Sequence, residues 1–234
     1  MYCGKRSSLR DGLALFSWRS AASFPWPFGP PVESRDSLTP DDFEIGMAES
    51  KTVPPEFLDS TKIFTGRVFN VTVDTVREGD KTYVREVVHH PGSAVILPVF
   101  ANDTIALVKQ YRHPAVKYLL ELPAGTLKDN ERPDEGAMRE LEEELGVTAG
   151  RMEKLCEFFV SPGFCEEKMW LYLATDLIET KQHLDDDELI EVVRMPIRRA
   201  LQMISDGEIE DAKTIIGLLL AAPRVGFEPD YPAV

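Results

Sequence analysis

Three glutamates lie close together in the middle of the chain, in a stretch whose composition favours a helix. Glu140, Glu143 and Glu144 occupy positions i, i+3 and i+4, and they fall within roughly 100° of arc because a helix turns by about 100° per residue. The apolar residues on the opposite side are Met138, Leu141 and Leu145. Neighbouring like charges repel, and a hard divalent cation that prefers oxygen ligands reverses that repulsion. The spacing therefore predicts a carboxylate site for Mg²⁺ or Mn²⁺, with a solvated acidic helix face as the alternative.

The residues around these glutamates complete a longer pattern. Gly125 is followed after five residues by Glu131, and after seven more by residues 139–147, which read RELEEELGV. The whole fits G-x5-E-x7-R-E-U-x-E-E-x-G-U, in which U is a bulky apolar residue, at every specified position. Average residue frequencies make a chance match on the order of one in ten million. The chain therefore resembles the Nudix hydrolases, and the resemblance extends from about residue 52 to about residue 221.

This resemblance implies a metal-dependent enzyme that hydrolyses phosphoric anhydrides. It implies that Glu140 and Glu144 are the principal metal ligands and that Glu143 assists them. It further implies that the backbone carbonyl of Ala124 ligates the metal. The expected cofactor is Mg²⁺, with Mn²⁺ as a substitute. Such a metal site would neutralise the charge of a diphosphate and lower the pKa of a bound water.

Four other residues of the pattern are expected to shape the loop and the helix. Gly125 follows an apolar run and permits a turn that brings backbone carbonyls near a metal. Gly146 suits the position that ends a helix. The resemblance implies that Arg139 and Glu131 are mostly architectural and hold the loop and the helix together.

A second acidic segment follows the pattern, in residues 161–168, which read SPGFCEEK. It resembles the SPG-x-x-x-E loop of the ADP-ribose pyrophosphatase subfamily, in which a glutamate on a mobile loop takes a proton from the attacking water. Glu167 matches that glutamate, and the alternatives are the adjacent Glu166 or a solvated loop charge. The resemblance thus implies a catalytic set of Glu167 with Glu144 and Arg139.

Two further segments agree with the same subfamily, namely residues 121–127, ELPAGTL, and residues 110–112, QYR. We therefore expect the chain to hydrolyse ADP-ribose to AMP and ribose 5-phosphate. The resemblance implies that Arg85 and Arg112 contact the ribose-phosphate half, since an arginine fork suits phosphate oxygens, with surface salt bridges as the alternative. Another nucleoside diphosphate sugar as substrate is one alternative function. A sensor that binds ADP-ribose without turnover is another, and the intact pattern argues against it.

Three aromatic residues are candidates for gripping the adenine, although we expect each to be in the core. These are Phe64, Phe69 and Tyr83. The four histidines show no metal-ligand spacing, and we expect structural or surface roles for them.

Composition limits the partners. The net charge of −14 excludes a basic nucleic-acid footprint. There is no apolar run of about 18 residues, so we expect no membrane span. The three cysteines are odd in number and lack metal-like spacing, which favours free thiols in a reducing cytoplasm. By resemblance, the expected partners are a nucleotide sugar and a second copy of the chain.

The predicted fold is α/β, a Nudix α/β/α sandwich with a mixed sheet and a small N-terminal β-hairpin subdomain. Residues 1–46 are rich in proline and serine and are expected to be a disordered extension, with a targeting segment or an upstream start as alternatives. Residues 52–90 should form the hairpin subdomain that mediates dimerisation, 91–221 the hydrolase domain and 222–234 a tail. Strands are predicted over 63–76, 82–88, 94–100, 104–111, 155–160 and 168–174, and helices around the glutamates and over 197–205 and 209–221.

Overall fold

The computed structural model describes residues 53–184 and 189–227. The segment 1–46 and residues 228–234 of the predicted tail lie outside the described residues. Within the described part of the chain, no helix has the length and apolar character needed to cross a membrane.

An antiparallel sheet with the order β1-β2-β3 opens the described chain. Its strands are β1 (Glu56–Thr65), β2 (Asn70–Glu78) and β3 (Lys81–His89). The prediction of a single strand over 63–76 was wrong, because the chain turns at Gly66, whose backbone N–H donates to the Phe69 carbonyl at 2.9 Å. The predicted hairpin is therefore a three-stranded sheet, and its first strand was largely missed.

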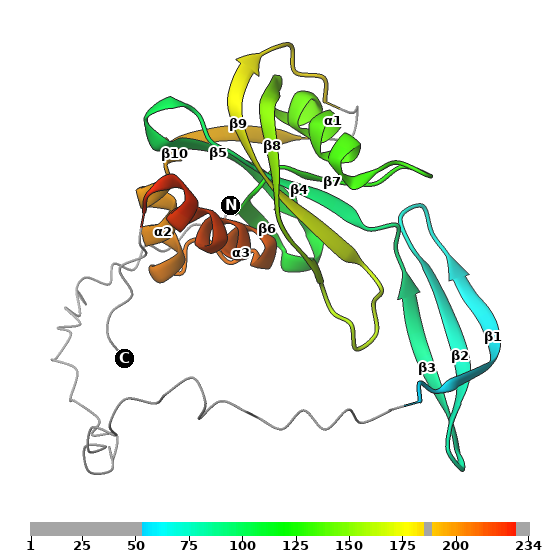
Figure 1. Cartoon of the computed structure of the whole chain (residues 1–234). Helices are drawn as coiled ribbons and strands as arrows, with labels where there is room; N and C mark the ends of the chain where they lie inside the picture. The colour runs from blue at the N-terminus through cyan, green and yellow to red at the C-terminus, as the bar shows by residue number, and fades with distance from the viewer. Residues whose placement is uncertain (1–52, 185–188, 228–234) are drawn as a thin grey trace, which may run out of the picture. The chain divides into compact units, whose positions relative to one another are not determined.

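Two further sheets form the centre of the molecule (Figure 1). The four-stranded sheet has the order β7-β4-β9-β8, with β7 (Ala124–Thr126), β4 (Ser93–Pro98), β9 (Lys168–Glu179) and β8 (Val147–Phe159). The three-stranded sheet has the order β10-β5-β6, with β10 (Ile190–Pro196), β5 (Thr104–Arg112) and β6 (Lys117–Glu121). Strands β4 and β9 run parallel while the other neighbours run antiparallel, so the four-stranded sheet is mixed, as predicted.

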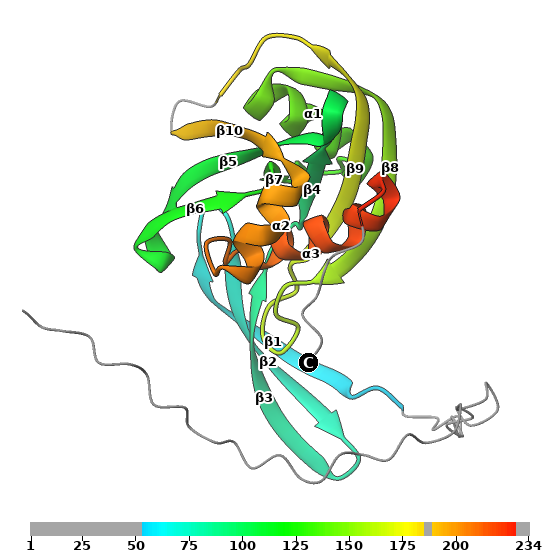
Figure 2. The same cartoon turned by 90° about the vertical axis from the view of Figure 1, so that its left-hand side faces the viewer.

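Helices cover these strands on opposite sides, as Figure 1 and the turned view of Figure 2 show. The helices are α1 (Pro133–Leu145), α2 (Ile197–Ser205) and α3 (Ala212–Ala221). Short 3-10 turns occur at η2 (Ala101–Asp103), η3 (His113–Ala115) and η4 (Ala222–Val225). With α1 on one side and α2 and α3 on the other, the α/β/α sandwich is confirmed.

Strand β4 lies at the centre of the packing because every one of its residues is buried. Val95 and Leu97 belong to the core cluster that includes Leu218 of α3. Ile96, which points to the opposite face of the sheet, belongs to the cluster that includes Leu141 of α1. A strand buried on both faces must be apolar throughout, and burial of each large side chain contributes roughly 1.5–3 kcal/mol. The position of β4 is thus strongly determined, and the candidate site is built on its first residues.

Several element boundaries differ from the predictions. Strands β8 and β9 are each longer than predicted, because they pair with one another along nearly their whole length. Strand β10 was not predicted, although it pairs with β5 over seven residue pairs from Ile190 to Pro196. Helix α3 begins at Ala212 instead of residue 209, since Asp211 serves as its N-cap.

Candidate active site

The glutamate-rich segment forms helix α1, and its two ends have the expected chemistry. The helix starts at Pro133, and two acidic residues of the first turn, Asp134 and Glu135, complement the helix dipole. It ends at Gly146, which adopts a left-handed conformation with φ of +64°. A Cβ on Gly146 would also lie 2.7 Å from the backbone nitrogen of Gln182. Both facts favour glycine at this position.

Arg139 links the helix to the loop that precedes it. Its Nε and Nη2 atoms donate to the two carboxylate oxygens of Glu131 at 2.7 and 2.9 Å, and Nη2 also donates to the Thr126 carbonyl at 3.2 Å. The Arg139 hydrogen bonds hold the pKa of Glu131 at about 2, well below its ordinary value. Nη1 of Arg139 donates to Glu140 and, at 2.7 Å, to Glu143. Arg139 therefore holds the loop and also pairs with two of the three expected ligands.

The carboxylate of Glu140 lies directly against the backbone of Gly125. A Cβ added at Gly125 would lie only 1.8 Å from the Glu140 Oε1 atom, so any side chain there would displace the carboxylate. Gly125 follows Ala124 in β7, so the contact brings the helix carboxylate next to the loop carbonyl expected to ligate a metal. Glu140 and Glu144 are buried, at 6% and 4% exposure, whereas Glu143 is partly exposed. The buried pair shows that the acidic stripe is not simply a solvated helix face.

These donors suit a hard divalent cation, because carboxylate and carbonyl oxygens are the ligands that Mg²⁺ and Mn²⁺ prefer. They are not preassembled as a cluster: within residues 53–184 and 189–227, no group of three or more His, Cys, Asp or Glu side chains is gathered closely enough to hold a metal ion. The geometry gives a reason, because Glu140 and Glu143 both turn towards the guanidinium of Arg139. Arg139 thus pairs with both of these carboxylates.

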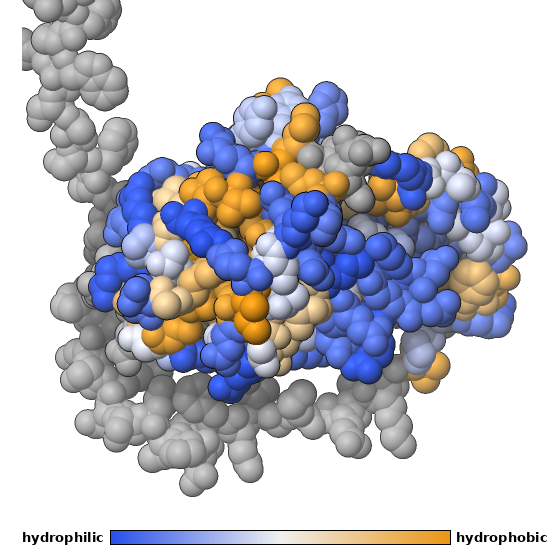
Figure 3. All heavy atoms as spheres, turned by 90° about the horizontal axis from the view of Figure 1, so that it is seen from above, coloured by the Kyte–Doolittle hydropathy of each residue, from blue (hydrophilic) through white to orange (hydrophobic). Residues whose placement is uncertain are grey.

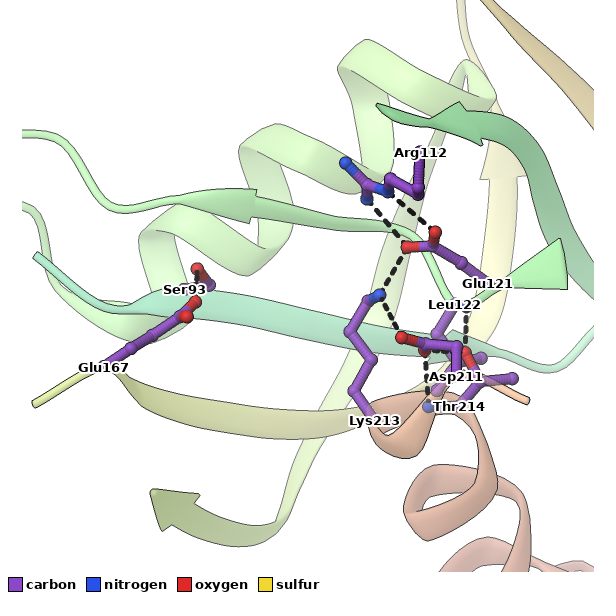
Figure 4. Close-up of polar contacts among 8 residues, drawn as sticks. All are labelled: Ser93, Arg112, Glu121, Leu122, Glu167, Asp211, Lys213 and Thr214. Carbon is purple, nitrogen blue, oxygen red and sulfur yellow. Dashed lines mark hydrogen bonds and ion pairs between the residues drawn. The ribbon is translucent and has the colours of Figure 1, made fainter. Parts of the chain in front are cut away.

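Glu167 lies at the end of the connection between β8 and β9. Its Oε1 atom accepts a hydrogen bond of 3.0 Å from the hydroxyl of Ser93, the first residue of β4 (Figure 4). The same oxygen lies 3.7 Å from Nδ1 of His90. Ser93 is paired with Thr126 across the β4–β7 ladder, one residue beyond Gly125. The loop glutamate is therefore held at the same end of the sheet as the loop that leads to α1.

The neighbouring Glu166 has a different environment. Its carboxylate lies 3.1 Å from Nδ1 of His89 and is about half exposed. The loop itself is anchored to β3, since the backbone of Val88 bonds both to Phe164, at 2.8 Å, and to Glu166, at 3.0 Å. Two backbone hydrogen bonds thus join the loop to β3, and the mobility of the loop stays a prediction. Of the two glutamates, Glu167 is the one that faces the start of β4.

Arg112 and Arg85 occupy separate places. Arg112 ends β5, and its Nε and Nη2 atoms donate to the two carboxylate oxygens of Glu121, both at 2.7 Å. Arg85 lies on β3 with its guanidinium 4.2 Å from the ring centroid of Tyr83. It lines an open cavity of about 430 Å³ together with Phe159 of β8 and residues of the 161–166 loop. The two arginines therefore contact different residues, Arg112 at Glu121 and Arg85 beside Tyr83.

The expectation that the three aromatic candidates are core residues was wrong, because none of them belongs to a core cluster of the described residues. Phe64 and Phe69 are exposed, and their ring centroids lie 5.7 Å apart. Tyr83 is half-buried and donates from its hydroxyl to Glu78 at 3.0 Å. Among the residues that the structure describes, every residue of β1 is exposed, and Phe64 and Phe69 are accessible as well.

Four residues near the site were not singled out from the sequence, namely Ser93, His90, Glu121 and Lys213. Glu121 lay within the segment 121–127, and the resemblance of that segment to the subfamily was the one available signal. Lys213 and Glu121 are in contact although 92 residues separate them in the sequence. A local sequence pattern cannot predict such a long-range contact.

Comparison with known proteins finds relatives of this chain. The model of the NUDIX domain matches residues 89–216. The chain is 40% identical over 169 residues, which is 71% of this chain and 89% of the relative, to a protein named "ADP-ribose pyrophosphatase" from Bacillus subtilis (strain 168). It is 39% identical over 175 residues, 74% of this chain and 92% of the relative, to a protein named "Methanol dehydrogenase activator" from Bacillus methanolicus.

A solved structure supports the fold independently. The crystal structure of an ADP compounds hydrolase superposes with a TM-score of 0.65, covering 73% of this chain and 94% of that chain at 23% identity. At this level of identity the likeness is one of fold.

Proposed function

This chain belongs to the Nudix family, and from that premise we propose that it hydrolyses the pyrophosphate bond of ADP-ribose to AMP and ribose 5-phosphate. The observation that carries the proposal is the contact of the Glu140 carboxylate with the backbone of Gly125. This contact joins the acidic face of α1 to the loop carbonyl of Ala124. Glu167 is held by Ser93 at the same end of the sheet.

Four groups would hold the metal, which we propose to be Mg²⁺, with Mn²⁺ as a substitute. They are the carboxylates of Glu140, Glu143 and Glu144 and the backbone carbonyl of Ala124. When bound, the metal would neutralise the charge of the diphosphate and make a water molecule more acidic. Arg139 pairs with Glu140 and Glu143, and its bidentate contact with Glu131 keeps the helix and the loop together.

Glu167 is the proposed general base that takes a proton from the attacking water. The Ser93 hydroxyl donates to the Glu167 carboxylate and so fixes its position at the start of β4, since a general base must lie within reach of the water it deprotonates. Glu166 instead pairs with His89 on the sheet side of the loop. This difference supports Glu167 over Glu166 as the base.

Substrate binding is assigned to Arg112 and Arg85. Arg112 offers a rigid guanidinium for phosphate oxygens because Glu121 holds one edge of it. Arg85 lies beside an open cavity that also contains aromatic side chains, including Phe159 and Phe164, which suit stacking on a planar base or sugar.

We further propose that the protein is a homodimer formed through the β1-β2-β3 sheet. Phe57, Ile63 and Val84 on this sheet are exposed, with Phe57 at 61%. Figure 3 shows orange, hydrophobic residues among hydrophilic ones on the face of the molecule that is seen from above. Exposed apolar residues on a thin sheet favour a protein partner. A cytoplasmic location also belongs to the proposal, since Cys156 and Cys165 are free thiols.

A panel of nucleoside diphosphate compounds tests the function. Each compound is incubated with the protein and Mg²⁺, and the products are separated and identified by mass. The proposal expects ADP-ribose to be hydrolysed with the highest kcat/KM and to yield AMP and ribose 5-phosphate. A higher kcat/KM for another nucleoside diphosphate sugar would move the assignment to that sugar. Absence of any turnover, with stimulation of a dehydrogenase instead, would favour the activator role named for the second relative.

A further inference from the structure

A chain of four alternating charges joins the start of α3 to the end of β5 (Figure 4). Arg112 of β5 donates two hydrogen bonds to Glu121, the last residue of β6. The ammonium of Lys213 donates to the same Glu121 carboxylate from α3 and lies 3.0 Å from Oδ1 of Asp211. Two positive and two negative side chains therefore balance one another.

The two central members of this chain of charges are buried. Glu121 is 1% exposed and Lys213 is 7% exposed, so neither charge is stabilised by bulk water. A buried charge is costly unless it is paired and hydrogen-bonded. Burial alone would raise the pKa of Glu121, yet Arg112 and Lys213 together hold that pKa below its ordinary value. Glu121 is therefore a carboxylate with two cationic partners, and it depends on both.

The position of Lys213 is set by the cap of α3. Asp211 accepts hydrogen bonds from the backbone nitrogen of Thr214 at 3.0 Å and from its hydroxyl at 2.6 Å. The Thr214 hydroxyl accepts in turn from the backbone nitrogen of Leu122 at 2.8 Å. The first turn of α3 is thus bonded to the residue that follows Glu121, which leaves little freedom for the Lys213 ammonium.

The other end of the chain of charges faces outwards. Glu121 engages the Nε and Nη2 atoms of Arg112, and Figure 4 shows the third guanidinium nitrogen pointing away from Glu121. The Arg112 side chain is about two-fifths exposed, whereas Glu121 is buried. One edge of the guanidinium is therefore held by the protein, and the opposite edge is left to bind a ligand.

We propose that Lys213 is a positioning residue for substrate binding: together with Asp211 it orients Glu121, and Glu121 presents the outer edge of Arg112 to a phosphate of the nucleoside diphosphate substrate. This inference rests on the proposed function, because Arg112 must contact the substrate for its orientation to matter. It extends the site to helix α3, nearly seventy residues beyond α1 in the sequence.

Steady-state kinetics of Lys213→Met tests the inference. Methionine keeps an unbranched stem of similar length and removes the charge. KM is measured for whichever nucleoside diphosphate the wild type hydrolyses. We expect KM to rise about tenfold while kcat changes less than about threefold, a size typical of a weakened charged hydrogen bond. Arg199→Met is the matched control, because it removes an exposed cation of α2 that pairs with Glu208, and its KM should stay within about twofold of wild type.

A double-mutant cycle shows whether Lys213 acts through Arg112. In an Arg112→Met background, Lys213→Met should add no more than about a twofold rise in KM. Lys213→Arg restores a cation and should recover most of the wild-type KM. If Lys213→Met folds poorly, Glu121→Gln removes the charge at the centre of the same contacts and enters the same cycle.

Three results would overturn the inference. They are an unchanged KM in Lys213→Met, an equal rise in KM with and without Arg112, and a loss confined to thermal stability. Each can occur with a wild type that hydrolyses ADP-ribose, which leaves the proposed function standing. A wild type that hydrolyses no nucleoside diphosphate overturns both.

Discussion

At the scale of single residues, the site contains several carboxylates, and each has a different partner that distinguishes its role. Glu140 rests on Gly125, Glu167 accepts from Ser93 and Glu121 pairs with Arg112. The sequence predicted that Glu140, Glu143 and Glu144 lie on one helix, and α1 contains all three. It could not predict their partners, because Ser93 and Glu167 are 74 residues apart and meet only through the pairing of β4 with β9.

Glu167 and Glu166 provide a direct comparison of adjacent residues. Glu167→Gln should lower kcat by roughly 10²–10⁴-fold, the usual range for loss of a general base, while leaving the affinity for Mn²⁺ unchanged. Glu166→Gln is the matched control and should change kcat only a few-fold, because Glu166 pairs with His89. Single-turnover measurements with ADP-ribose compare the two variants. A larger loss of kcat in Glu166→Gln than in Glu167→Gln would show that Glu166 is the general base.

At the scale of elements, buried strands were easier to predict than exposed ones. Strand β4 is buried on both faces and appears in the sequence as an unbroken apolar run. All ten residues of β1 are exposed, so no alternation of apolar and polar residues marked it in full. The boundary of α3 was missed by three residues, since Asp211 and Thr214 form its cap through side-chain hydrogen bonds that the apolar periodicity does not report.

The packing of α1 against β7 gives a prediction at this scale. Gly125→Ala places a Cβ where the Glu140 carboxylate lies, so the helix carboxylate must move away from the Ala124 carbonyl. We expect affinity for Mn²⁺, measured by isothermal titration calorimetry, to fall at least about tenfold. Gly163→Ala is the control, because a Cβ at Gly163 meets no atom within 4 Å. Equal Mn²⁺ affinities in the two variants would contradict the proposed contact between helix and loop.

At the scale of the whole molecule, the exposed N-terminal sheet is the surface that a second copy should cover. The double change Phe57→Ser and Ile63→Ser removes two large exposed apolar side chains from β1. It should convert a dimer into a monomer at micromolar concentration, as measured by light scattering after size exclusion. Ile178→Ser, at an equally exposed position on β9, should leave the dimer intact. A wild type that is monomeric at high concentration would exclude the dimer altogether.

The proposed hydrolysis requires the acidic face of α1 to bind a divalent cation. Electron paramagnetic resonance of free Mn²⁺ measures how tightly the wild type and Glu144→Gln bind the ion. The measurement does not depend on turnover. We expect the wild type to bind Mn²⁺ at neutral pH in the presence of a nucleoside diphosphate, and Glu144→Gln to bind it at least about tenfold more weakly. Equal binding by the two proteins, or none by the wild type, would contradict the assignment of the metal site.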